Sequence, residues 1–330
     1  MKKYYVNLFI VLVFLFFNMN SFSQQEPSKY PPLKYISQLR NINDYYLYAN
    51  GGFHADWYIG YNNSWIVKFP SISKDGYIKA FIGAKIGRAK NISFPSSTDI
   101  NPVMGKIYIA VSQEPNFLSD SIYFLTTTDE IPKEPLPSDN ISGVDSSKWF
   151  WAQLPLSKIS SEKPNYLAIW GQTEELNSSS NSPIIAAGYD DSEEDEENAW
   201  LNHSIKGAPP SGENALETAI SGIKPAIAIK LIPQNEFKVI IKNFSAEIDE
   251  NLILVNFSVI GVDIQRAWLE ISYDKFEWQK ITNYIYSSPY SVILKRDEIS
   301  SDMFYLRAAA SDNYENIGYS KEITIPRKIK

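Results

Sequence analysis

The sequence predicts an all-β protein built from two β-sandwich domains. From residue 45 onward, short runs rich in Ile, Val, Tyr, Phe and Trp alternate with clusters of Asn, Gly, Pro, Ser and Asp. No segment has the length and period of an amphipathic helix, and residues 212–220 would form one or two helical turns at most. The 330 residues exceed what one ordinary core requires and suit two domains.

The N-terminus has the pattern of a secretory signal peptide. Lys2 and Lys3 precede an apolar run over residues 8–17, and Ser21 and Ser23 supply small residues before a cleavage point. Such a run is too short to cross a bilayer, and no later stretch is long enough. We expect residues 1–23 to be removed, Gln24 to become the N-terminus, and the chain to be exported without a membrane span. An uncleaved N-terminal anchor is the alternative.

The first domain is expected over residues 38–232, after a Pro-containing, extended lead-in at residues 24–37. Its strands are predicted from the short apolar runs between turn-forming clusters. These runs are residues 64–69, 77–82, 106–111, 122–126, 149–154, 166–170, 184–187 and 226–231.

The second domain is expected over residues 233–330, because a strand ends at Ile232 and is followed by Pro233 and polar residues. Its predicted strands are residues 238–242, 252–259, 266–273, 278–281, 290–294, 303–310 and 320–325. Seven strands in about 95 residues is the count and spacing of an immunoglobulin-like sandwich. Strict alternation places Ala267, Leu269, Ile271 and Tyr273 on one face of their strand. Along a later strand it likewise groups the side chains of Phe304, Leu306, Ala308 and Ala310.

Four pieces of this domain carry a family resemblance. They are the strand and charged turn at 267–274, Trp278 after that turn, the segment SPYSV at 288–292, and FYLRAAASD at 304–312 followed by Asn316 and Gly318. Residues 262–325 thereby resemble the bacterial Ig-like module found repeatedly in large exported proteins. The resemblance implies an accessory or spacer module without catalysis.

Two positions depart from the pattern of that module. Lys275-Phe276 stands where the module has a Gly-containing turn, and Glu315 stands where it has a glycine before Asn316. These departures concern the geometry of two loops rather than the fold.

The first domain resembles a jelly-roll sandwich in its succession of short, aromatic-rich strands. It opens on an aromatic-rich stretch at 57–61 and closes on the alternating strand 226–231. Galactose-binding-like and carbohydrate-binding modules use that architecture, so the resemblance implies sugar recognition by analogy of fold.

Composition excludes several classes of chemistry. The chain has no cysteine and two histidines, which excludes disulfides, thiol nucleophiles, Cys-ligated zinc and iron–sulfur clusters. Its net charge of −7 and its lack of a basic stripe argue against nucleic-acid binding. No nucleotide-binding, serine-hydrolase or zinc-protease motif is present, so no catalytic residue is assigned.

The candidate ligand-binding residues are Trp57, Tyr58, Tyr61 and Asn62. They lie in a Gly- and Asn-rich stretch, where flat rings can stack on a sugar while neighbouring amides bond its hydroxyl groups. The alternative is that these rings fill the core, as large aromatic side chains usually do. That alternative is preferred for Trp149, Trp151 and Trp170, which lie in regular strands.

The candidate metal ligands are Asp190, Asp191 and Glu193. They belong to a run over residues 190–197 in which every residue but Ser192 is acidic. Clustered carboxylates suit Ca²⁺, which binds six to eight oxygen atoms. Dense like charge without an EF-hand register is also typical of a solvated loop, and no other cofactor is expected.

These observations predict an exported, non-catalytic binding protein. Its first domain would recognise carbohydrate or a cell-envelope component such as an envelope protein, and its second would be an accessory or spacer. One alternative is a secreted carbohydrate-active hydrolase with a carboxylate pair, for which Glu174 and Glu175 are the first candidates. The other is a purely structural envelope protein.

Overall fold

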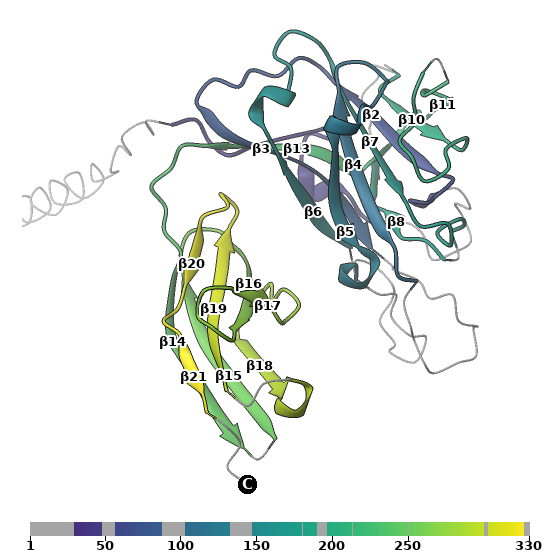
Figure 1. The fold of residues 1–330 in the computed structure, drawn as a ribbon. Helices are drawn as coiled ribbons and strands as arrows, with labels where there is room; N and C mark the ends of the chain where they lie inside the picture. The colour runs from purple at the N-terminus through teal and green to yellow at the C-terminus, as the bar shows by residue number, and fades with distance from the viewer. Residues whose placement is uncertain are drawn as a thin grey trace, which may run out of the picture. The chain divides into compact units, whose positions relative to one another are not determined.

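The fold is that of an all-β protein, as the sequence predicts. The computed structural model describes residues 30–47, 57–87, 103–132, 147–179, 181–189, 197–212, 214–249, 251–299 and 303–326. Within these ranges the only helical elements are three-residue 3-10 turns, and every strand pair is antiparallel (Figure 1). No helix in the described part of the chain is long and apolar enough to cross a membrane. The predicted signal peptide, residues 1–23, lies outside the described residues.

The strands before residue 234 form two main sheets, which we call the first sandwich. The five-stranded sheet contains β1 (Lys34–Ser37), β13 (Ile227–Pro233), β3 (Tyr77–Gly87), β6 (Ser147–Leu154) and β8 (Ile184–Ile185). The six-stranded sheet contains β11 (Thr218–Ala219), β10 (Ala199–Asn202), β2 (Ser64–Phe69), β7 (Asn165–Gly171), β4 (Lys106–Ser112) and β5 (Ile122–Thr127). A small ribbon pairs β9 (Ala187–Tyr189) with β12 (Ile223–Pro225).

The core of the first sandwich lies between its two sheets. Alternate residues of β3, such as Ile82 and Ile86, are fully buried there together with Ile107 and Ile109 of β4 and Trp65 of β2. Burying one such aliphatic side chain contributes about 1.5–3 kcal/mol relative to leaving it exposed. Burial of these alternating apolar side chains is therefore the principal source of stability of the first sandwich.

Two segments differ from the sequence prediction. Residues 34–37, placed in the extended lead-in, form β1, which pairs with β13 and so belongs to the five-stranded sheet. Residues 212–220, the best helical candidate, contain the short strand β11 and no helix among their described residues. In both cases the partner strand, rather than local propensity, decides the conformation.

The strands after residue 239 form the second sandwich. Its three-stranded sheet contains β14 (Ile240–Asp249), β15 (Leu252–Ile260) and β18 (Tyr290–Lys295). Its five-stranded sheet contains β17 (Gln279–Lys280), β16 (Ile264–Ser272), β19 (Phe304–Asp312), β20 (Ile317–Tyr319) and β21 (Ile323–Ile325). The alternation predicted for β19 is confirmed, because Phe304, Leu306, Ala308 and Ala310 are all fully buried. On β16 the alternation is confirmed for Ala267, Leu269 and Ile271 but not for Tyr273, which follows the strand and is 48% exposed.

Both departures from the Ig-like pattern fall at left-handed backbone positions. Lys275 has φ of 68° and Glu315 has φ of 56°, a region that glycine occupies without steric cost and other residues rarely adopt. The turn geometry that would favour glycine is therefore kept at both positions. At residue 315 the side chain makes specific contacts, described below.

Candidate functional site

Trp57, the first of the predicted ligand-binding residues, lies in the core. It is 9% exposed, its ring centroid lies 4.2 Å from that of Trp65, and its Nε1 donates a hydrogen bond to the Ile185 carbonyl at 2.8 Å. A ring enclosed in this way has no open face for a sugar. The structure thus favours the core alternative that the sequence leaves open for this residue.

Tyr58, Tyr61 and Asn62 surround a turn before β2. The buried Tyr58 donates from its hydroxyl to Asn62 Oδ1 at 3.0 Å, and Asn62 Nδ2 donates to the Asn177 carbonyl at 3.2 Å. Tyr61 is half-buried and lies against Gly207, where an added Cβ would be only 2.5 Å from its ring. The contacts of these residues hold two loops together, and ligand binding by Tyr58, Tyr61 and Asn62 stays a prediction.

The predicted metal ligands Asp190, Asp191 and Glu193 lie outside the described residues. Among the residues that are described, no three His, Cys, Asp or Glu side chains are grouped so that they could hold a metal ion. Calcium binding by the acidic run therefore stays a prediction.

An aromatic surface that the sequence analysis missed lies on the outer side of the five-stranded sheet. Phe150 and Ala152 of β6 point into the core, so Trp149 and Trp151 lie on the other side of the strand and are half-buried. Trp149 packs edge-on against the buried Tyr45, with ring centroids 6.0 Å apart. The two indoles are stacked, with centroids 5.1 Å apart and planes 14° apart. We call the half-buried Tyr35, Trp149 and Trp151, together with the buried Phe81 beneath them, the aromatic face.

Gly83 of β3 makes room for this arrangement. It is paired with Trp151 across the β3–β6 ladder, and an added Cβ would lie 2.5 Å from a ring atom of Trp151 and 2.3 Å from the Phe150 carbonyl oxygen. Tyr35 of β1 flanks Trp151 at 5.9 Å. The indole therefore lies over the backbone of the neighbouring strand, which holds the ring in place.

Two lysines accompany the aromatic face. The fully buried Lys230 of β13 places Nζ 4.7 Å from the centroid of the Phe81 ring and 5.0 Å from that of Trp151. Burial lowers the pKa of Lys230, and the Glu315 carboxylate, with an oxygen 2.7 Å from Nζ, opposes that shift. Lys85, opposite Trp149 in the ladder, donates to the Tyr45 carbonyl at 2.6 Å. Both ammonium groups are therefore engaged within the protein, and the Lys230 ammonium packs against the buried side of the aromatic rings.

The environment of Tyr35 predicts a loss of stability at high pH. Burial, with smaller contributions from the charges of Glu315 and Asp263, raises the pKa of Tyr35 to about 12. Because the folded state favours the neutral phenol, its stabilisation is complete below pH 10 and is lost as the pH rises toward 12. We expect the free energy of unfolding to fall by up to about 3 kcal/mol over that interval. Denaturant titrations of the wild type and Tyr35→Phe would test this, and an equal fall in both would assign the loss to other groups.

The outer side of the six-stranded sheet is also aromatic but is largely covered. Trp170 and Trp200 are buried there beneath Phe117 and Ile205, which come from loops. Trp170 is thus buried as predicted, but in this outer layer rather than between the sheets. Of the aromatic side chains on this sheet that the structure describes, Phe124, at the edge on β5, is the one that is more than half exposed.

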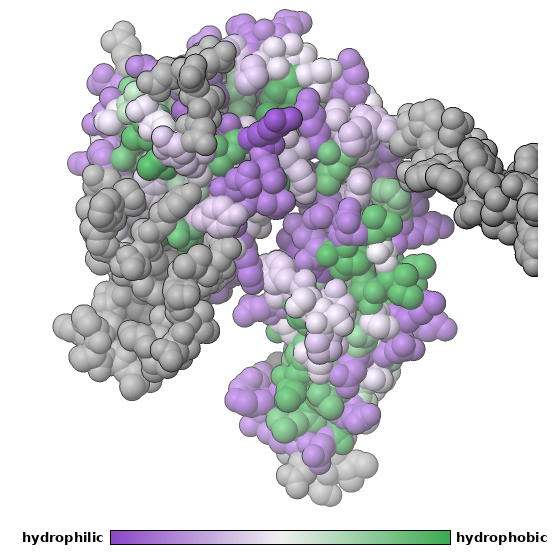
Figure 2. Space-filling model, turned by 180° about the vertical axis from the view of Figure 1, so that it is seen from behind, coloured by the Kyte–Doolittle hydropathy of each residue, from purple (hydrophilic) through white to green (hydrophobic). Residues whose placement is uncertain are grey.

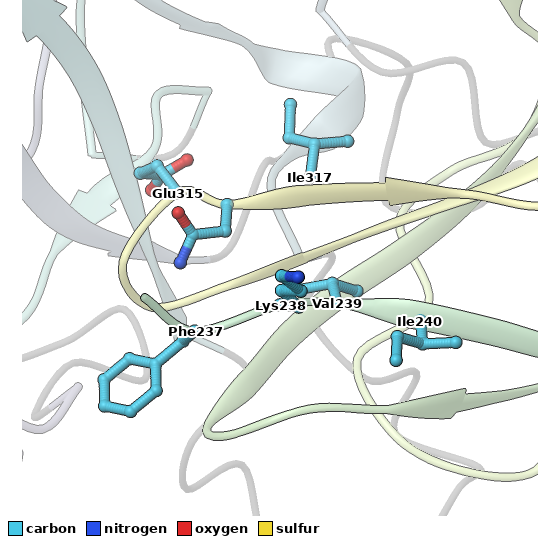
Figure 3. A pocket seen from close by; sticks show the side chains of 7 residues that line it. Phe237, Lys238, Val239, Ile240, Glu315 and Ile317 are labelled. Carbon is cyan, nitrogen blue, oxygen red and sulfur yellow. The ribbon is translucent and has the colours of Figure 1, made fainter. Parts of the chain in front are cut away.

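A pocket of about 570 Å³ lies in the second sandwich, between the segment leading into β14 and the loop before β20. Figure 3 shows Glu315 and Ile317 on one side and Phe237 pointing outward. Its carboxylate, Glu315, is paired with Lys230 and lies 3.4 Å from Arg266, and Asn316 is hydrogen-bonded to Asp312 and Asn235. Glu315 and Asn316 are therefore engaged within the protein, and the pocket lining contains no carboxylate pair.

The candidate hydrolytic residues Glu174 and Glu175 do not face each other across a pocket either. Glu174 and Glu175 are both exposed in the turn that follows β7. Hydrolysis requires two carboxylates facing each other across a substrate. Two consecutive exposed side chains do not provide that geometry.

Comparison with known proteins identifies no family for this chain. No family model and no curated protein matches the sequence. Solved structures that resemble it include the β-1,2-glucanase of Parabacteroides distasonis, at 10% identity and a TM-score of 0.25, over 81% of this chain and 31% of that one. The glycoside hydrolase domain of Endo-D from Streptococcus pneumoniae R6 matches at 11% identity and a TM-score of 0.28, over 80% and 32%.

A third solved structure is the FN1–FN3 segment of chicken CNTN1. It matches at 10% identity and a TM-score of 0.26, over 78% of this chain and 68% of that one. The chain spans about a third of the length of the two bacterial enzymes. At these TM-scores the likenesses carry no functional argument.

Proposed function

We propose that this chain is an exported, non-catalytic binding protein whose first sandwich recognises carbohydrate through the aromatic face. The second sandwich, which resembles an Ig-like module, would serve as an accessory or spacer. The jelly-roll resemblance of the first sandwich supports the same assignment by analogy of fold. The single observation that carries the proposal is the half-buried pair Trp149 and Trp151 on the outer side of a sheet.

The chemistry of the aromatic face suits a saccharide. Indole rings contribute apolar area that matches the C–H faces of a sugar ring, and they have little conformational entropy to lose. Their positions are held before any ligand arrives, by the Gly83 backbone beneath Trp151 and by the neighbouring Tyr35. Pre-organisation of this kind lowers the cost of binding.

We expect Trp149→Ala and Trp151→Ala each to weaken retention on a polysaccharide about tenfold, which corresponds to about 1.4 kcal/mol of lost contact. The measurement is a pull-down of the purified chain from Gln24 onward on a panel of insoluble and arrayed polysaccharides. Trp278→Ala, which removes a half-buried tryptophan of the second sandwich, is the matched control and should bind like the wild type. Thermal melting of each variant separates lost binding from lost folding.

The same samples decide between the alternatives. Release of reducing sugar would replace the binding proposal with the hydrolase, and sensitivity to EDTA would favour calcium at the acidic run. No retention on any polysaccharide would favour an envelope-protein partner or a purely structural role.

A further inference from the structure

The edge strand β18 of the second sandwich has an unpaired side. It lies at the end of the order β14–β15–β18 and, in the part of the chain that the structure describes, pairs with β15 alone. On the opposite sheet the nearest edge, β17, is only two residues long. The backbone donors and acceptors on the outer side of β18 are therefore available to another strand.

The outer side of β18 carries one large exposed apolar side chain. Val292 and Leu294 point inward, whereas Ile293 lies on the outer side between the polar Ser291 and Lys295. Ile293 is 64% exposed and pairs with Leu254, which is 36% exposed, and Leu252 nearby is 43% exposed. Figure 2 shows hydrophobic side chains at the surface of the second sandwich among hydrophilic ones.

A groove opens beside this edge, between the two sheets. It measures about 580 Å³, and Ile271 and Ile281 line it opposite Val292 and Leu294. A small apolar molecule could fill the groove but would leave the backbone of β18 unpaired. An added β-strand satisfies both, because its alternate side chains enter the groove while its backbone completes the ladder.

We propose that the added strand is β18 of a second copy of this chain, paired antiparallel about a two-fold axis at Ile293. The segment from Ser291 to Lys295 reads polar, Val, Ile, Leu, polar, which is complementary to its own reverse. In this register Ile293 faces the partner's Ile293 on the outer side. On the inner side Val292 faces the partner's Leu294, so each copy supplies apolar side chains to the paired grooves. The interface is isologous, as in most homodimers.

The charges on the edge agree with this register. Lys295 is the only charged residue of β18, and it faces the partner's Ser291 rather than another lysine. Its ammonium lies 3.0 Å from Glu298, and both side chains are more than half exposed, so the charge of Lys295 stays solvated. No like charges oppose each other directly, a contact that would destabilise the ladder.

The absence of cysteine from the sequence permits a direct test. Residues that face each other in an antiparallel ladder have Cα atoms about 4.5–5.5 Å apart, which suits a disulfide. Under mild oxidation Ile293→Cys should form a covalent dimer on the order of a hundredfold faster than Ile248→Cys, given a millimolar effective concentration against about 10 µM protein. Ile248 is a matched control because it is 45% exposed on β14, the opposite edge of the same sheet. Equal rates for the two variants would overturn the proposal.

Sedimentation of the purified wild-type chain over a range of concentrations provides a second test without a new bond. The wild type should show a dimer that Ile293→Lys abolishes and Ile248→Lys retains, while melting temperatures report whether each variant is folded. A wild type that stays monomeric throughout the range, or an Ile293→Lys variant that is folded and still dimeric, would refute pairing through β18. Neither test needs a carbohydrate, so their outcomes are independent of the proposed function.

Discussion

Trp65→Ala is expected to lower the free energy of unfolding of the first sandwich by about 3–5 kcal/mol. It removes the largest fully buried side chain between the two sheets and leaves a cavity there. The substitution also removes one of two side-chain donors to the Tyr58 carbonyl, which accepts from Trp65 Nε1 at 2.9 Å and from Asn63 Nδ2 at 2.8 Å. Trp57, whose ring contacts Trp65 at 4.2 Å, would lose a neighbour on one side. A loss of this size is a large fraction of the stability of an ordinary domain.

Chemical denaturation of the two proteins measures this loss. Trp149→Ala is the matched control, because it removes a half-buried tryptophan from the outside of the opposite sheet. It should cost less than half as much stability while weakening polysaccharide binding. Equal losses for the two variants would mean that Trp149 is structural rather than part of a binding surface.

Glu315→Gln is expected to cost about 3–5 kcal/mol, because it leaves the Lys230 ammonium buried without its anion. Lys230 is fully buried, and the side chain of Glu315 is 12% exposed. The variant keeps the shape of the side chain and the backbone at residue 315, so its effect reports on charge. Denaturant unfolding at neutral pH provides the measurement.

Two further variants establish the cause of that loss. Glu322→Gln breaks a comparable ion pair with Lys275, whose side chains are 45% and 44% exposed, and should cost less than about 1 kcal/mol. Adding Lys230→Met to Glu315→Gln should restore most of the stability, because the uncompensated charge is then gone. A double variant no more stable than Glu315→Gln would contradict this explanation.

Strand positions are predicted well by the sequence, because alternation and turn residues are local signals. Residues 64–69 form β2 with the predicted bounds, and most other predicted strands overlap an observed one within a few residues. The observed strands that the sequence does not predict are short ones such as β1 and β10 (Ala199–Asn202), which are held by pairing with β13 and β2. Their sequences carry too few residues for a periodic signal.

The sequence of β6 does not determine which of its two sides faces the core. Trp149 and Trp151 are correctly predicted to share one face of a strand, but the general tendency of large aromatic rings to be buried favours the core for that face. The strand reads W-F-W-A-Q-L, with large apolar residues on both sides, so alternation alone does not decide which side is inside. The position of the opposing sheet places Phe150 inward and the tryptophans outward.

By itself, the sequence determined the all-β class, the strand positions and the chemistry that a chain without cysteine excludes, since these depend on composition and on neighbours along the chain. Only the tertiary structure decided that Trp57 is enclosed, that Trp149 and Trp151 form a surface and that Glu315 pairs with Lys230. The physical reason is that burial and ion pairing depend on residues far apart in the sequence. Glu315 and Lys230, for example, are separated by 85 positions.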